Sequence, residues 1–391
     1  MIVLLIWALL LALFALSVRL GARVGLLPII SQLLMAGVGL PLLVLFAIEP
    51  HWQPGVSALT SPAWVHGLYS LAFALLLQQI IGEAVDLELD RRTLLIALPS
   101  FAVPFAVGIG CALWLLPQMS GLGQFSLGLV FAITAIPVLY LYLKHIDYPP
   151  EASRRLLQTA MLIDLTCWSL FGVANGLGRL DAVLLPLVAA FTPWLLHRLG
   201  LRRPLGYSLC LFVLLALAEH FALNALLLGV GFVLNLAWLK IPVVAPLPAR
   251  WLGPLQNGVA IPLLLGCGIL KIDLHGALTE LRPEQWLGLL LAPMAAKVLG
   301  SWLGVAWSGL GSNAWGQGPR PRLSAAILLN IRGLSEIVFL NLLLKQQLIS
   351  PAVYLALMLM SLVATLLPAL AGFHRIPQNH YPEARRPRAE H

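Results

Sequence analysis

The stretch IVLLIWALLLALFALSVR, residues 2–19, is almost entirely apolar and carries no charge before its last residue. A bilayer core of about 30 Å needs about 20 such residues in one α-helix. Comparable runs recur along the chain to about residue 373. Backbone polar groups in lipid must be satisfied within the segment, and these runs are continuous and do not alternate. The sequence therefore predicts an all-α polytopic membrane protein.

The composition excludes an ordinary soluble protein. Hydrophobic residues make up 60% of the chain and charged residues only 10%, with a mean hydropathy of +0.91. Residues 1–20 lack the basic region and small-residue cleavage site of a signal peptide, so we expect them to form a membrane span. The four cysteines lie in apolar runs without paired spacing, which predicts neither disulfides nor a metal site.

We predict one transmembrane domain, residues 1–373, followed by a short, basic, disordered cytoplasmic tail, residues 374–391. The domain contains about thirteen spans. They are 2–19, 25–48, 64–83, 93–116, 124–144, 156–177, 180–198, 206–220, 221–240, 253–271, 284–308, 322–344 and 352–373.

The basic residues predict the orientation of these spans. Alternate loops on one side hold eighteen of the 24 lysines and arginines, and the opposite loops hold four. Such a bias places the N-terminus outside and the C-terminus inside the cell, with an odd number of spans. It also explains the formal charge of +8 without nucleic acid as a partner. No Gly-rich phosphate loop is present, so we do not expect ATP-driven transport, and we expect a multi-pass protein of the inner cell membrane.

Four ionisable residues lie inside the predicted spans, and each is a functional hypothesis because burying a charge in lipid is costly. Asp164 lies in TAMLIDLTCWSLF, residues 159–171. Removing a carboxylate from water disfavours its charged form, so that a proton and a cation compete for it. The alternative for Asp164 is a hydrogen bond that packs two helices. Lys297 either pairs with Asp164 or donates to carbonyls of a broken helix, in a structural or a titrating role.

Arg332 and Glu336 lie four residues apart, which predicts one helix face and either a local ion pair or a gate. Glu219 and His220, in contrast, are expected at an external turn.

Two predicted helices are interrupted. Pro137 stands inside the apolar run of span 124–144, with Thr134 just before it, and proline breaks the helical hydrogen-bond ladder. Asn330, Arg332 and Gly333 stand at a comparable place in span 322–344. Interrupted helices at corresponding places in two halves point to the midplane site of a transporter.

Several segments resemble the cation:proton antiporter-2 family, whose membrane domain is of the sodium/hydrogen exchanger type. That family shows ITAFPVLARIL, then an Asn-Asp or Asp-Asp pair before V-x-x-W, and later NTRGLVELIVLN. Here the corresponding stretches are ITAIPVLYLYL (133–143), IDLTCW (163–168) and NIRGLSEIVFLN (330–341). KVLG from Lys297, IPLLLGCGILKIDL (261–274) and LISPAVYLALMLMSLVATLL (348–367) extend the resemblance over nearly the whole chain.

The resemblance implies inverted repeats, a core domain with two crossing interrupted helices, a dimerisation domain, and a homodimer that works by alternating access. It implies exchange of Na⁺ or K⁺ for protons without a cofactor, in the service of ion and pH homeostasis. Asp164 matches the essential aspartate, and Lys297 matches the lysine that pairs with the acidic residues. Thr134 and Pro137 match the first crossover helix, and the second is matched by Asn330, Arg332, Gly333 and Glu336.

One departure bears on function. Ile163 replaces the first polar residue of the pair, which leaves a single carboxylate and predicts electroneutral exchange. It also leaves open an altered substrate, or a sensor or scaffold that does not transport. An enzyme is not expected, since no HExxH, DDxxD or CxxC motif is present.

Overall fold

Every regular element that the structure, a computed structural model, describes is a helix. The described residues are 2–49, 55–82, 90–146, 148–176, 191–220, 225–244, 248–308 and 319–370. The predicted tail 374–391 and most of the predicted span 180–198 lie outside these ranges, so those two predictions stay predictions.

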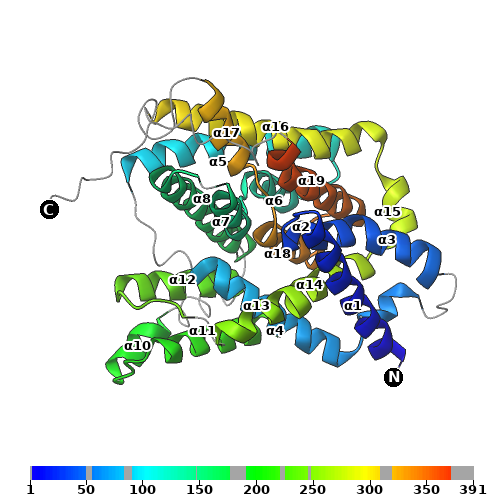
Figure 1. Ribbon diagram of the computed structural model, residues 1–391, viewed down its shortest axis with the longest axis horizontal. Coiled ribbons are helices and arrows are strands. Elements are labelled where there is room, and N and C mark those ends of the chain that lie inside the picture. Colours follow the sequence, from blue (N-terminus) through cyan, green and yellow to red (C-terminus); the bar gives the residue numbers. More distant parts are fainter. Residues whose placement is uncertain are drawn as a thin grey trace.

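One set of helices, which we call the scaffold group, lies mainly in the lower half and at the right of Figure 1. It consists of α1 (Ile2–Arg23), α2 (Pro28–Leu34), α3 (Leu40–Leu43), α4 (Ala63–Gly82), α11 (Pro204–His220), α12 (Ala225–Trp238), α13 (Ala249–Leu255) and α14 (Ile261–Leu270). Single π-helical turns at Met35–Gly39, Val44–Ile48 and Gln256–Ala260 extend these helices. As a result, residues 28–48 and 250–270 each form one continuous span.

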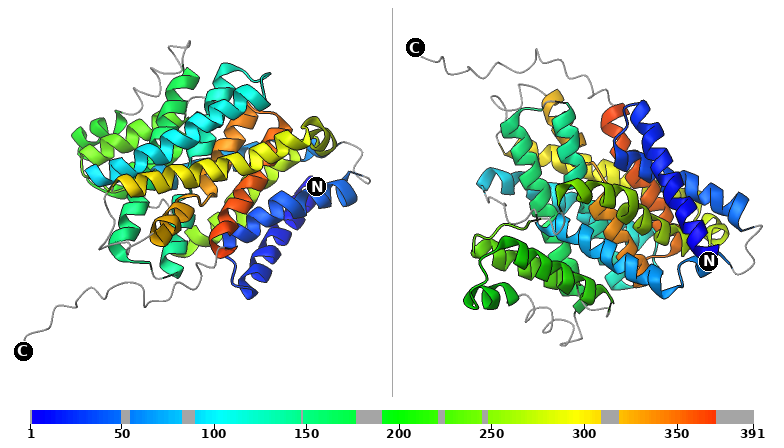
Figure 2. Two further views of the ribbon diagram at one scale, coloured as in Figure 1. Left: turned by 90° about the horizontal axis from the view of Figure 1, so that it is seen from above. Right: turned by 60° about the horizontal axis from the view of Figure 1, so that its bottom comes forward.

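The second set, the crossover group, occupies the centre and upper half of Figure 1. It consists of α5 (Arg91–Leu115), α6 (Gly121–Ala132), α7 (Ile136–His145), α8 (Pro150–Gly176), α16 (Pro283–Trp307), α17 (Pro319–Leu329), α18 (Leu334–Lys345) and α19 (Pro351–Leu370). Helices α5 and α16 pack along each other and lie side by side in Figure 2. The short helices α10 (Thr192–Arg198) and α15 (Leu274–Glu280) and the 3₁₀ turn Val56–Leu59 complete the described elements.

The crossover group contains the same order of helices twice. A long helix, a broken helix and a further helix follow one another as α5, α6–α7 and α8, and again as α16, α17–α18 and α19. The two broken helices are the ones that the sequence predicts to be interrupted. This repetition agrees with the inverted repeats that the resemblance implies.

Length and hydropathy support membrane spanning. Seven described helical stretches are long and apolar enough to cross a bilayer, and further apolar helices are shorter. Large apolar side chains are exposed on the outside of the bundle, for example Leu4, Leu5 and Leu9 on α1 and Leu98 and Trp114 on α5. Water would not favour such a surface, whereas lipid tails would. The chain is thus a multi-pass membrane protein, while the count of thirteen spans stays a prediction.

Two ion pairs join helix ends that are predicted to lie on the same, outer side of the membrane. The predicted outer ends of α11 and α18 are joined by Glu219 and Lys345, whose atoms Oε1 and Nζ lie 2.5 Å apart. Another outer contact joins Glu49 to His275 at 3.3 Å. Glu219 and His220 are the last residues of α11, and the turn expected there, residues 221–224, lies outside the described residues. Glu219 is only 5% exposed, and Lys345 partners its carboxylate.

The first break follows from Pro137, which stands in the first turn of α7. In a continuous helix its ring would clash with the carbonyl four residues earlier, and it has no N–H to donate. Helix α6 therefore ends at Ala132, and Ile133 is extended, with φ −56° and ψ 148°. In the second break, residues 330–333 are not helical and α18 begins at Leu334.

Candidate functional site

The two breaks cross and hydrogen-bond to each other. The Ala135 N–H donates to the carbonyl of Ile331 at 3.0 Å, and the Thr134 hydroxyl donates to the carbonyl of Leu329 at 3.2 Å. Glycine at position 333 allows this approach, because a Cβ there would lie 2.8 Å from the side chain of Val138. Backbone groups freed by one break are thus satisfied by the other, as a low-dielectric interior requires.

Asp164 meets this crossing from α8. The residue is 2% exposed, and its Oδ1 accepts a hydrogen bond from the backbone N–H of Thr134 at 3.0 Å. Its Oδ2 is buried and has no hydrogen-bond partner among the described residues. The N-terminal end of α7, which begins two residues after Thr134, favours negative charge nearby. One oxygen of this carboxylate is therefore held, and the other is available to a ligand.

Two buried cations cap the C-terminal end of α6. The Lys297 ammonium, from α16, donates to the carbonyls of Ala132 and of Ser100, the latter at 3.2 Å. The Arg332 guanidinium donates to the carbonyls of Val130 at 2.5 Å and Phe131 at 2.6 Å. The last carbonyls of a helix lack intrahelical donors and carry partial negative charge, so both cations are favourable there.

Of the two partners predicted for Lys297, the structure shows the broken-helix carbonyl. Within the described part of the chain, Lys297 and Asp164 form no ion pair shorter than 4 Å. Both side chains nevertheless approach the same break, because α8 and α16 each contact α6.

Arg332 and Glu336 form the predicted ion pair, with Nη1 and Oε1 separated by 3.5 Å and both side chains fully buried. The expected geometry is corrected, because Arg332 lies in the break and not on a helix, while Glu336 lies in the first turn of α18. Ser361 donates to Glu336 Oε2, and Thr365 donates to the Arg332 carbonyl at 2.7 Å. Glu336 Oε2 therefore accepts a hydrogen bond, whereas Oε1 accepts none among the described residues and is balanced by the charge of Arg332.

Three hydroxyl groups of the crossing were not predicted from the sequence. Ser335 is fully buried in the first turn of α18, and its hydroxyl donates to the Thr134 carbonyl at 3.3 Å. Ser361 and Thr365 lie on one face of α19, four residues apart, and both are fully buried. The signal that identifies this pair is two small polar residues at helical spacing in an otherwise apolar run. Asn330, which was predicted, is also buried, and neither polar atom of its side chain has a partner among the described residues.

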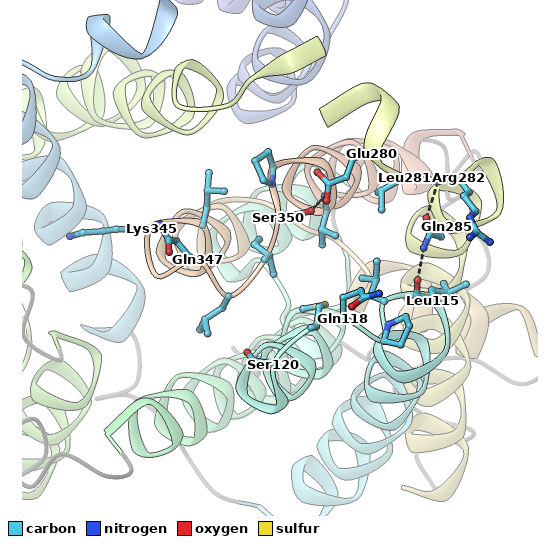
Figure 3. Close-up of a pocket in the computed structure, with 18 of the residues that line it drawn as sticks. Leu115, Gln118, Ser120, Glu280, Leu281, Arg282, Gln285, Lys345, Gln347 and Ser350 are labelled. Carbon is cyan, nitrogen blue, oxygen red and sulfur yellow. Dashed lines mark hydrogen bonds between the residues drawn. The ribbon is translucent and has the colours of Figure 1, made fainter. Parts of the chain in front are cut away.

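An outer crevice lies above the crossover group, between loops that are predicted to face outward. It is a cavity of about 1320 Å³, and Figure 3 shows Lys345 and Gln347 on one side and Glu280, Arg282 and Gln285 on the other. Gln285 closes one wall by donating to the carbonyl of Leu115 at 2.5 Å. The lining of the crevice includes Asn341 and Val353 of the crossover group. Asp164 is not part of the lining and is buried, so the crevice does not reach it.

Two broken helices cross inside a helical membrane bundle, with opposing charges and an incompletely partnered carboxylate at the crossing. Interrupted helices of this kind are typical of secondary transporter folds. The sodium proton antiporter MjNhaP1 from Methanocaldococcus jannaschii has a similar fold, with a TM-score of 0.57 and 16% sequence identity, covering 95% of each chain.

The sequence is also similar to curated antiporters, although no protein-family model matches it. The Na⁺/H⁺ antiporter NhaS4 of Synechocystis is 24% identical over 377 residues, which are 87% of this chain and 88% of that protein. Cation/H⁺ antiporters 19 and 15 of Arabidopsis thaliana are 26% and 24% identical over 72% and 73% of this chain. The chain spans only 39% and 38% of the length of these two plant relatives. The predicted resemblance to cation:proton antiporters is confirmed, and the relatives are transporters and not enzymes.

Proposed function

We propose that the chain is a secondary antiporter that exchanges one monovalent cation, Na⁺ or K⁺, for one proton at Asp164. The observation that carries the proposal is the buried Asp164 carboxylate at the crossing of two broken helices, whose Oδ2 has no hydrogen-bond partner among the described residues. Cation/H⁺ and Na⁺/H⁺ antiporters among its relatives support this choice of substrates.

Buried charge favours electroneutral exchange. Lys297 and Arg332 supply two positive charges, and Asp164 and Glu336 supply two negative charges when both are ionised. Binding either a proton or a monovalent cation at Asp164 adds one positive charge. The two loaded states therefore carry the same net charge, and exchanging one for the other moves no net charge across the membrane.

Alternating access completes the proposed cycle. An ionised Asp164 with an unpartnered oxygen is costly to move through a low-dielectric interior, so the loaded states are the ones that cross. Helices α18 and α19 contact α4, α14 and α2 of the scaffold group, and movement at these contacts would expose Asp164 to either side. We further propose that the N-terminus lies outside and the C-terminus inside the cell, and that the protein forms a homodimer in the inner cell membrane.

Proton flux in proteoliposomes tests the proposal. A pH-sensitive dye is enclosed, Na⁺ or K⁺ is added outside, and the original protein is compared with Asp164→Asn, which keeps the shape of the side chain but cannot exchange a proton. We expect cation-dependent flux in the original protein and none above protein-free vesicles in Asp164→Asn. Asp273→Asn, at an exposed aspartate before α15, is the matched control and keeps full flux.

A folded Asp164→Asn protein with full exchange would contradict the proposal. The second candidate function is a sensor or scaffold that keeps the antiporter fold, and the apolar Ile163 beside Asp164 favours it. Well-folded original protein without flux for either cation would support that candidate.

A further inference from the structure

A cation that leaves water for a buried site needs several oxygen ligands to replace its hydration shell. Asp164 Oδ2 supplies one of them in the proposed site. The neighbouring residue on α8, Ile163, supplies none and is itself buried. The remaining ligands must come from other elements that reach the crossing.

Ser335 reaches the crossing from the opposite broken helix. Its side chain is fully buried and donates to the carbonyl of Thr134, the residue whose N–H donates to Asp164 Oδ1. A serine in the first turn of α18 thus contacts the same residue of the first break that holds the Asp164 carboxylate. Burying a hydroxyl costs free energy unless its polar atoms form interactions, which points to a ligand for the remaining lone pairs of this oxygen.

The hydrogen bonds across the breaks leave hydroxyl oxygens free to bind a cation. Ser335 directs its proton to the Thr134 carbonyl, and Thr134 directs its own to the Leu329 carbonyl. A hydroxyl that donates its proton keeps two acceptor lone pairs. Neither oxygen accepts a hydrogen bond from the described residues, so the lone pairs of both remain available, as does Asp164 Oδ2.

The sequence shows a matching exchange of polar groups. At position 335 the chain has serine in NIRGLSEIVFLN, where the resembled pattern NTRGLVELIVLN has valine. At position 163 it has isoleucine, where the resembled Asn-Asp or Asp-Asp pair begins with asparagine or aspartate. Relative to the resembled motifs, this chain lacks a polar side chain next to Asp164 on α8 and has an additional one, Ser335, on α18.

We propose that Ser335 Oγ is a ligand of the transported cation, together with Asp164 Oδ2 and the Thr134 hydroxyl. The ligand is a dehydrated alkali cation, and Ser335 takes over the part of the missing polar residue at position 163. The proposal rests on the proposed function, since it concerns the same site. Because Ser335 belongs to α18, cation binding draws the two broken helices together.

Cation-dependent thermal stability tests Ser335 without any transport step. The purified protein is titrated with Li⁺, Na⁺ and K⁺, and the midpoint of the rise in melting temperature is compared between variants. Ser335→Ala is expected to raise the cation concentration at that midpoint about tenfold, because one polar contact to a charged group is lost. Ser335→Thr keeps a hydroxyl and keeps the original midpoint. Ser335→Cys fills the same space with a poor ligand for alkali cations and loses affinity as Ser335→Ala does.

Ser126→Ala is the matched control. Ser126 is a fully buried serine of α6 whose hydroxyl donates to the Leu122 carbonyl of its own helix, and its removal leaves the midpoint unchanged. Ile163→Asn, added to Ser335→Ala, is expected to recover part of the lost affinity. A merely structural role for Ser335 would lower the melting temperature without moving the midpoint, and that result would overturn the inference.

The same titration separates the two proposals. If Asp164→Asn removes the response to cations while Ser335→Ala keeps the original midpoint, the proposed site stands and Ser335 is not a ligand. If the original protein shows no response to any of the three cations, both proposals fall.

Discussion

The crossing contains two buried carboxylates that differ in how they are held. Glu336 has Arg332 at 3.5 Å from one oxygen and the Ser361 hydroxyl at the other. Asp164 has a single backbone N–H at one oxygen and no partner among the described residues at the other. Although Glu336 Oε1 accepts no hydrogen bond from the described residues, its charge is balanced by Arg332, so we expect this pair to hold the structure in place. For Asp164, which has no counter-charge within 4 Å in the described part of the chain, we propose that the free oxygen exchanges its ligand.

Replacing Arg332 tests the structural half of this comparison and has the largest expected effect. Arg332→Met leaves Glu336 buried without its counter-charge and removes the donor from two carbonyls of α6. We expect the free energy of unfolding to fall by about 3–5 kcal/mol. Thermal unfolding in detergent measures this, with Arg282→Met as the control, because Arg282 forms an exposed pair worth less than about 1 kcal/mol. Equal losses in the two variants would show that the pair with Glu336 is not structural.

Lys297 is buried at the same crossing, and we expect its replacement to lower the stability less than the replacement of Arg332. Lys297→Met removes the donor from the carbonyls of Ala132 and Ser100, which costs about 1–3 kcal/mol of stability. Since Lys297 caps α6 and does not pair with Asp164, we expect cation/proton exchange to continue at one proton per cation. The flux assay and a melting curve measure both quantities. A stable Lys297→Met protein without exchange would show that Lys297 itself carries the proton.

The smallest expected effect on stability concerns the contact between the two groups of helices. A Cβ on Gly268 of α14 would lie 2.0 Å from the Tyr354 hydroxyl and 2.7 Å from Asn341 Oδ1, both in the crossover group. A Cβ on Gly266 would meet only Trp7 of the scaffold group, at 3.1 Å. Overpacking of this kind costs about 1 kcal/mol or somewhat more.

If the crossover group moves against the scaffold group, Gly268→Ala should slow exchange while the cation midpoint stays unchanged. Gly266→Ala, two residues away on the same helix, should leave the rate as it was. Equal rates in the two variants would place the movement somewhere other than this contact.

The sequence was sufficient for the features that depend on local chemistry. Apolar runs identified the membrane helices, Pro137 indicated the first break, and Asp164 stood out because a carboxylate in an apolar span is costly. The partner of Lys297, in contrast, could not be predicted from the neighbouring sequence. Lys297 reaches the Ala132 carbonyl because α16 packs against α5 and α6, and no spacing in the sequence reports that packing.

Long-range partners also explain what was missed. The ion pair of Glu219 was not predicted because its partner, Lys345, is 126 residues away. In the sequence, Ser335 is indistinguishable from an ordinary helical serine. Its hydrogen bond to the Thr134 carbonyl, 201 residues away, is visible only in the structure. A polar residue whose partner comes from the other repeat leaves no periodic signal, whereas Ser361 and Thr365, on the same face of one helix, do.

The bonds between the breaks have a consequence for biosynthesis. The Thr134 hydroxyl finds its acceptor 195 residues later, and the guanidinium that caps Val130 is 202 residues away. While the ribosome is still making the second repeat, the first broken helix is in the bilayer with its freed carbonyls unsatisfied, which costs several kcal/mol per group in lipid. Because Pro137 prevents an unbroken helix, we expect the first repeat to keep those groups hydrated until the second repeat is inserted. The proposed ion site would thus be assembled last, when the chain is nearly complete.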